Sequence, residues 1–167
     1  SLKLTVRSPK IRLSINSSDA VVNLLRRDAD IAIRMVKPTQ STLIARRLGH
    51  IRLLPCAAQS HIDRWGMPRT MPEAFRQPLI LPDTALDYLA NLGREGLSID
   101  DLNVVMKTDC FPVAWKAISA GLGVGVASEY MIDRSAHVHR LPIDLRVPPL
   151  PLWLAVHREL RSNAAIR

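Results

Sequence analysis

The feature that most constrains the fold is a regular alternation of short apolar runs with helix-like stretches. Strand-like runs lie at residues 2–7, 10–15, 30–35, 43–48, 51–57, 78–81, 102–106, 124–127, 138–141 and 152–157. Between them, helical spacing of apolar residues marks segments 19–27, 59–65, 72–77, 84–97 and 109–122, and a short helix is expected after Ser128. This alternation predicts an α/β fold with a mainly parallel sheet.

The composition supports such a fold and excludes several classes of protein. Apolar residues make up 47% of the 167 residues but aromatic residues only 4%, so the core must consist of Leu, Ile, Val and Ala. Two isolated cysteines fit a reducing cytoplasm better than a disulfide framework. No signal segment or membrane span is visible, so we expect a cytoplasmic protein without a membrane partner.

Charge and metal-binding patterns point away from two further classes. The formal charge is +8, but the arginines are spread in ones and twos, which favours a solvated surface over a nucleic-acid-binding face. No Cys or His cluster has the spacing of a zinc site, so neither a metal nor another cofactor is expected. His137 and His139 alternate along one predicted strand, where a surface position is favoured over a weak metal pair.

One junction does not fit the alternation. The first two strand-like runs are separated only by Ser8 and Pro9. Parallel neighbours need a crossover of about a dozen residues, and a tight hairpin would favour Asn-Gly over Ser-Pro. The two runs form either one bent strand or a pair from which a helix is missing; the second interpretation is preferred.

Five segments in order resemble a known family. They are LLRRDADIAIRM from Leu24, TLIARRLGHIRLLPCAAQSHIDRWG from Thr42, PLI from Pro78, VVMKTDCFPVAWKAISAGLGVGVASEYM from Val104 and PPLPLWLAVHREL from Pro148. In this order they resemble the effector-binding domain of LysR-type transcriptional regulators. The resemblance covers nearly the whole chain. It departs from the family at Ser8–Pro9, where the family's first helix is absent, and after Arg167, where the last helix is cut short.

The resemblance implies a two-lobed architecture. We expect two Rossmann-like lobes joined by two crossover strands, the plan of type 2 periplasmic-binding proteins. The first lobe would comprise residues 1–49 and 150–167, and the second residues 50–149. The winged helix-turn-helix that binds DNA in this family is absent from the sequence, so the chain should contact DNA only through that missing domain.

Open α/β sheets bind ligands beyond the carboxyl ends of their strands, which here places the effector in the cleft between the lobes. The family's cleft positions fall on strand ends and helix starts, at Ser8, Ser17, Ile33, Arg34, Met35, Leu81, Pro82, Asp83, Thr108, Asp109 and Phe111. Amides at the helix starts near Ser17 and Thr108 favour an anionic group. Arg34 is suited to a bidentate contact with a carboxylate. Together these residues predict a small anionic effector, most plausibly a carboxylate.

Simpler interpretations stand beside these assignments. Ser17, Thr108 and Asp109 are also suitable as plain helix caps, Arg34 as half of an ion pair, and Phe111 as a core residue. Cys110 lies at a helix start, where a thiolate is stabilised, but a redox switch is not predicted because no resolving cysteine is near it in the sequence. Cys56 lies in an apolar strand and should be inert.

The expected function is regulation by effector sensing. An enzyme is not expected, because no G-x-S-x-G, H-E-x-x-H or dinucleotide fingerprint is present. The glycines of GLGVG (residues 121–125) follow a helix and lead into a strand, which suits a helix C-cap and a tight turn into the sheet. The alternative function is a solute-binding protein of a transport system, which shares the two-lobed plan but needs an export signal.

The resemblance also implies self-association. A homodimer or tetramer is expected, with the helix at residues 19–27 packing against a helix of a second copy. That second helix is either the segment Gln59–Trp65 or the one that begins near Asp109, and the sequence does not choose between them.

Overall fold

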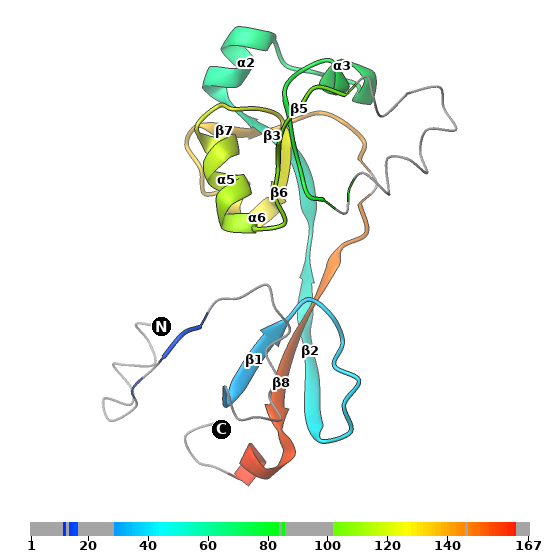
Figure 1. Cartoon of the computed structure of the whole chain (residues 1–167), viewed down its shortest axis with the longest axis vertical. Coiled ribbons are helices and arrows are strands. Elements are labelled where there is room, and N and C mark those ends of the chain that lie inside the picture. Colours follow the sequence, from blue (N-terminus) through cyan, green and yellow to red (C-terminus); the bar gives the residue numbers. More distant parts are fainter. Residues whose placement is uncertain are drawn as a thin grey trace. The chain divides into compact units, whose positions relative to one another are not determined.

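A computed structural model describes residues 12, 14–16, 29–83, 85, 102–145 and 147–162. The chain divides into two compact units, each described here by itself. Unit 1 comprises Ser1–Gly49 and Pro151–Arg167, and unit 2 comprises His50–Leu150. Two strands, β2 (Leu43–Ile51) and β8 (Leu150–His157), run across the boundaries between the units (Figure 1).

Unit 1 is built on a three-stranded sheet in the order β1-β8-β2, where β1 spans Ile31–Arg34. Strand β1 pairs with β8 in antiparallel register, and a 3-10 helix, η4 (Arg158–Ser162), follows β8. Leu43 and Ala155 are buried and pack with Ala29 and Ala32. The strands predicted at 30–35, 43–48 and 152–157 are therefore confirmed.

Several predictions for unit 1 lie outside the described residues. These are the strand at 2–7, the Ser8–Pro9 junction, the helix at 19–27 and any helix after Ser162. Of the strand expected at 10–15, the described residues 12 and 14–16 have no strand structure, and Ile15 is exposed.

Unit 2 contains a sheet whose central strand is β3 (Leu53–Ala58), a nearly continuous buried apolar run. Its antiparallel neighbours are β6 (Gly125–Ser128) and β7 (Val138–Arg140). Strand β4 (Leu79–Leu81) pairs in parallel with β5 (Val104–Lys107), and a parallel bridge from Leu79 to Val124 links β4 to the start of β6. The expectation of a mainly parallel sheet is wrong for the ladders of β3 and, in unit 1, for the ladder of β1 with β8. Among the described strands of unit 2, β4, β5, β6 and β7 share one direction, and β3 opposes its two neighbours.

The helices of unit 2 begin and end at the residues that local chemistry favours. Helix α2 (Gln59–Trp65) ends at Gly66, whose φ of 80° suits glycine. Helix α3 (Met71–Phe75) begins at Thr70, whose side chain accepts a hydrogen bond from the Glu73 amide. Helix α6 (Glu129–Ile132) begins at Ser128, whose hydroxyl accepts from the amide of Met131, as predicted. The helix expected at 84–97 lies outside the described residues apart from position 85.

Helix α5 (Phe111–Ser119) differs at its start from the prediction and matches it at its end. The N-cap is Cys110, with no side-chain hydrogen bond to the helix, so neither Thr108 nor Asp109 caps it. At the other end the Gly121 amide donates to Ile118 O and the Leu122 amide to Ala117 O, a Schellman motif that requires the φ of 78° at Gly121. The C-cap role predicted for GLGVG is confirmed.

A buried polar network joins α2 to the segment after α3. The His61 ring and Gln77 are both buried, and His61 Nε2 lies 3.0 Å from Gln77 Oε1. The Gln77 amide nitrogen donates to the carbonyls of Trp65, at 3.2 Å, and Gly66, at 3.3 Å. Because these contacts fix the amide orientation, His61 must donate to Gln77 through Nε2.

Candidate functional site

The carboxyl ends of β4 and β5 bring together five of the predicted site residues. The Thr108 amide donates to Leu81 O at 3.0 Å, and the Asp83 amide donates to Asp109 Oδ1 at 2.9 Å. Leu81 is 8% exposed and belongs to the core, so it offers only backbone atoms at this edge. Pro82 and Thr108 are half-buried, whereas both aspartates are exposed. This edge therefore presents one hydroxyl and two carboxylates.

The start of α5 offers fewer free amides than the sequence suggested. The Cys110 amide donates to Thr108 Oγ1 at 3.1 Å, and Pro112 has no N–H. The amides of Val113 and Ala114 both donate to the Cys110 carbonyl at 3.0 Å. Among the first residues of the helix, only the Phe111 amide donates to no acceptor in the described part of the chain.

Besides the cap role of Thr108, two of the simpler interpretations are wrong at this position. Phe111 is 42% exposed, so it is not a core residue. Asp109 does not cap α5, because its carboxylate holds the Asp83 amide instead and fixes the turn after β4. The ring of Phe111 is thus accessible beside the polar edge.

On unit 1, the predicted residues stand at the end of β1. Arg34 is half-buried and lies in register opposite Trp153 of β8, whereas Ile33 pairs with Leu154 and is 65% exposed. Because successive strand residues point to opposite faces, Arg34 and Ile33 lie on different faces of the sheet. Met35 follows and is exposed; Ser8 and Ser17 lie outside the described residues.

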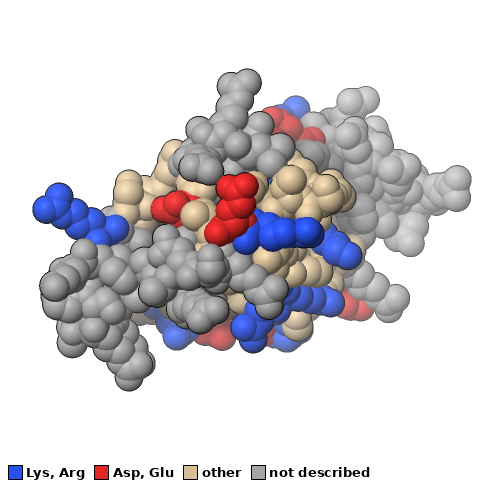
Figure 2. Space-filling view, turned by 90° about the horizontal axis from the view of Figure 1, so that it is seen from below, with Lys and Arg blue, Asp and Glu red and all other residues tan. Residues whose placement is uncertain are grey.

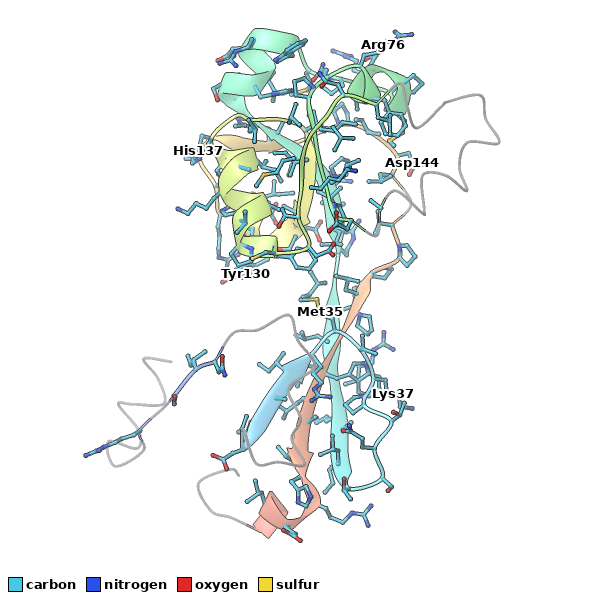
Figure 3. All side chains as sticks on the ribbon, in the orientation of Figure 1. Met35, Lys37, Arg76, Tyr130, His137 and Asp144 are labelled. Atoms are coloured by element: carbon cyan, nitrogen blue, oxygen red, sulfur yellow. The ribbon has the colours of Figure 1, made fainter. Side chains whose placement is uncertain are left out.

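Two residues near Arg34 were not predicted from the sequence. Lys37 Nζ lies 5.7 Å from the ring centroid of Trp153, a cation–π contact. Lys37 belongs to the connection between β1 and β2 (Figure 3). The Trp153 Nε1 atom is buried and has no hydrogen-bond partner among the described residues. No local signal in the sequence shows which distant strand β1 pairs with, so Trp153 could not have been identified from it.

The two cysteines of unit 2 have different surroundings. Burial raises the pKa of the Cys56 thiol to about 12, in agreement with the expectation of an inert residue. Cys110 is a free, partly exposed thiol. No disulfide joins them, since both are free.

Charged side chains at the surface form local pairs. Arg52 Nη1 lies 3.1 Å from Glu129 Oε1, and the Arg134 guanidinium stacks 3.7 Å from the Tyr130 ring centroid. In the view of Figure 2, the visible Lys and Arg side chains lie singly or in small groups, several of them beside Asp or Glu. This distribution is that of a solvated surface, and this view shows no extended basic face among the described side chains.

The described residues show neither a metal centre nor a membrane span. No group of three or more His, Cys, Asp and Glu among them is placed to hold a metal ion. His139 lies in β7, whereas His137 precedes it and is exposed. In the part of the chain that the structure covers, no helix is long and apolar enough to cross a bilayer.

Comparisons with known proteins agree with this architecture. The model of the LysR substrate binding domain family matches residues 3–167. The HTH-type transcriptional regulator CrgA of Neisseria meningitidis is 37% identical over 71 residues, which are 42% of this chain and 24% of that protein. The chain thus spans less than two thirds of the length of the curated relatives it matches.

Solved structures show the same fold. The regulatory domain of CrgA, described as a LysR-type transcriptional regulator, has a TM-score of 0.78 at 20% identity and covers 99% of this chain and 84% of its own. The regulatory domain of CcmR from Synechocystis PCC6803, in complex with 2-PG, has a TM-score of 0.62 at 15% identity. The match covers 93% of this chain and 78% of the CcmR chain. The predicted type 2 periplasmic-binding-protein-like α/β fold is confirmed.

Proposed function

The chain belongs to the LysR substrate binding domain family, and from this premise we propose that it senses a small anionic effector, a carboxylate, for a LysR-type transcriptional regulator. The observation that carries the proposal is the family match over residues 3–167. The complex of the CcmR regulatory domain with 2-PG supports small-molecule binding by this fold.

The proposed effector contacts are the strand-end residues predicted from the sequence. They are Ser8, Ser17, Ile33, Arg34 and Met35 on unit 1, and Leu81, Pro82, Asp83, Thr108, Asp109 and Phe111 on unit 2. The contribution of Leu81 is limited to its backbone, because its side chain is buried.

The proposed contact residues of the two units differ in charge, so we assign a different part of the effector to each unit. Arg34 and Lys37 provide cationic groups on unit 1, so the carboxylate of the effector is assigned there. Asp83 and Asp109 would repel an anion, so the edge of unit 2 suits hydroxyl or amino groups on the effector. The exposed ring of Phe111 suits an apolar part.

In the proposed mechanism, the effector shifts an equilibrium between conformations or assemblies of the regulator. It does so only through a difference in affinity between the two states. A winged helix-turn-helix domain elsewhere in the protein would bind DNA, and the regulator would act as a homodimer or tetramer. Because a transcriptional regulator must reach DNA inside the cell, we propose that the protein is cytoplasmic.

Other functions receive less support. The relatives are transcriptional regulators by name, so we propose that the chain catalyses no reaction. The same names do not favour a solute-binding protein of a transport system.

Calorimetric titration of the full chain with a panel of carboxylates tests the proposal. Arg34→Ala should weaken binding about ten- to a hundredfold, because hydrogen bonds to charged groups contribute about 1.5–3 kcal/mol. Arg46→Ala is the matched control, since Arg46 is an exposed arginine of the same unit. Unchanged affinity in Arg34→Ala would exclude its role, and binding of neutral metabolites alone would exclude the carboxylate.

A further inference from the structure

Unit 1 contains a buried hydrogen-bond donor that no described residue satisfies. Trp153 Nε1 is buried without a partner in the part of the chain that the structure describes, although the indole N–H can only donate. Buried polar groups in native proteins nearly always have a partner, so an unpaired donor calls for an explanation. An acceptor supplied by a ligand is one explanation, and it requires the groups that cover Nε1 to move aside when the ligand binds.

The surroundings of the indole have the chemistry of an anion site. Residues that lie directly opposite each other in an antiparallel pair share a face, so the Arg34 and Trp153 side chains project from the same side of the sheet. Lys37 Nζ lies 5.7 Å from the Trp153 ring centroid, and no described carboxylate forms an ion pair with Lys37. Arg34 also takes part in another interaction within the protein. The proposed anion site therefore does not require a free Arg34 side chain.

We propose that the Trp153 indole N–H is a specificity-determining donor to the carboxylate of the effector, with Lys37 as a second, cationic contact. The inference rests on the proposed function and extends it by two residues. A planar carboxylate has two acceptor oxygens, so it can accept from the indole and attract the ammonium group at the same time. An amine or ammonium group could not satisfy the indole, because it offers this donor no acceptor once protonated.

An internal acceptor is the competing explanation. Gln40 Oε1 is the other buried side-chain atom of unit 1 without a partner among the described residues. It is an acceptor, and it belongs to the same connection between β1 and β2 as Lys37. A rearrangement that joins it to Trp153 Nε1 would satisfy both atoms without any ligand.

Substitution by phenylalanine keeps an aromatic ring but removes the pyrrole ring together with its N–H donor, so its effect is compared with that of the same substitution at Trp65. Trp153→Phe should weaken binding of the carboxylate that binds wild type best, from a panel of benzoate, succinate and glutamate, by about tenfold. Gln40→Leu separates the two explanations, because it should leave the Trp153 indole signal of the free full chain in place if there is no internal hydrogen bond to lose. Trp65→Phe is the matched control, since Trp65 lies in unit 2 and is exposed.

Nuclear magnetic resonance provides a direct readout. The chain has three tryptophans, so its spectrum contains three indole N–H signals, and the one lost in Trp153→Phe is assigned to Trp153. Titration with the same carboxylate should move this signal and leave that of Trp65 in place. Lys37→Met should reduce the affinity as well, while Arg47→Met, at an exposed position on β2, should not.

The outcomes distinguish the inference from the proposed function. If Arg34→Ala abolishes binding but Trp153→Phe leaves the affinity unchanged, the inference is overturned, whereas the proposed sensor function remains supported. If Gln40→Leu moves the Trp153 signal of the free protein, the indole is paired internally and the inference fails. If no carboxylate binds wild type, the carboxylate proposal and the inference fail together.

Discussion

Replacement of Gly123 by alanine is expected to destabilise unit 2 severely, because there is no room for a side chain at this position. A Cβ atom on Gly123 would lie 2.6 Å from the Pro78 carbonyl oxygen and 3.0 Å from its carbon. Real Cβ atoms do not approach closer than 3.0 Å, so the carbonyl must move by at least 0.4 Å, the difference between 3.0 and 2.6 Å. Backbone cannot rotate away as a flexible side chain can.

The magnitude follows from what the Pro78 carbonyl holds. It accepts the Val124 amide at 2.8 Å, and the Ile80 amide donates to Val124 O at 2.8 Å. Overpacking costs about 1–3 kcal/mol, and weakening these sheet hydrogen bonds adds about 1 kcal/mol. A total of about 2–4 kcal/mol corresponds to a fall in Tm of roughly 5–15 °C for a chain of this size.

Gly49→Ala provides the matched control. Nothing lies within 4 Å of a Cβ atom at Gly49, and its φ is not positive. The change there should be neutral or slightly stabilising, because alanine restricts the unfolded chain. Urea unfolding followed by tryptophan fluorescence compares the two variants, with Trp65 and Trp115 reporting on unit 2. Equal stability of Gly123→Ala and Gly49→Ala would refute the packing argument.

Three further predictions follow from unit 2. Gln77→Ala should lower the free energy of unfolding by about 1–3 kcal/mol, since the buried His61 donor loses its acceptor; an unchanged urea midpoint would contradict this. At pH 8, a thiol reagent should modify only Cys110 in the folded protein, because the pKa of Cys56 is raised to about 12, and Cys110→Ser should abolish the fast reaction. The pKa of Glu73 is lowered from 4.5, mainly by a hydrogen bond from a backbone amide. Its contribution to stability is therefore present above that value and lost as the pH falls through the folded pKa, so wild type and Glu73→Gln should differ at neutral pH and converge in acid.

The sequence predicted those elements whose signals are local. Helix α2 and its end at Gly66 follow from neighbouring residues, as does the start of α6 at Ser128. The glycine at position 121 completes a helix end that a few consecutive residues determine. Such signals depend on caps and turn conformations, which are the same wherever the element lies in the fold.

Predictions failed where a residue had more than one possible partner. Asp109 has the chemistry of a helix cap, but its carboxylate holds the Asp83 amide across the ends of β4 and β5. Thr108 accepts from Cys110 for a similar reason. The direction of β3 was also mispredicted, because an apolar run shows burial on both faces but not the orientation of its neighbours. Which of several possible partners a side chain contacts depends on the tertiary structure and not on the local sequence.

The same reasoning explains why only one half of the anion site that we propose for unit 1 could be predicted from the sequence. Arg34 ends a strand that the apolar pattern reveals, so its position at the sheet's edge follows from the sequence. Trp153 becomes its neighbour only through the register in which β1 pairs with β8. A one-residue slip of that register would turn the indole to the opposite face, away from Arg34. The buried Ala155 and the partly buried Ala32 pair in the same register and pack with Leu43. The packing that fixes this register therefore also sets the position of the proposed indole donor, so a bulky substitution at Ala155 should impair carboxylate binding without touching the ligand.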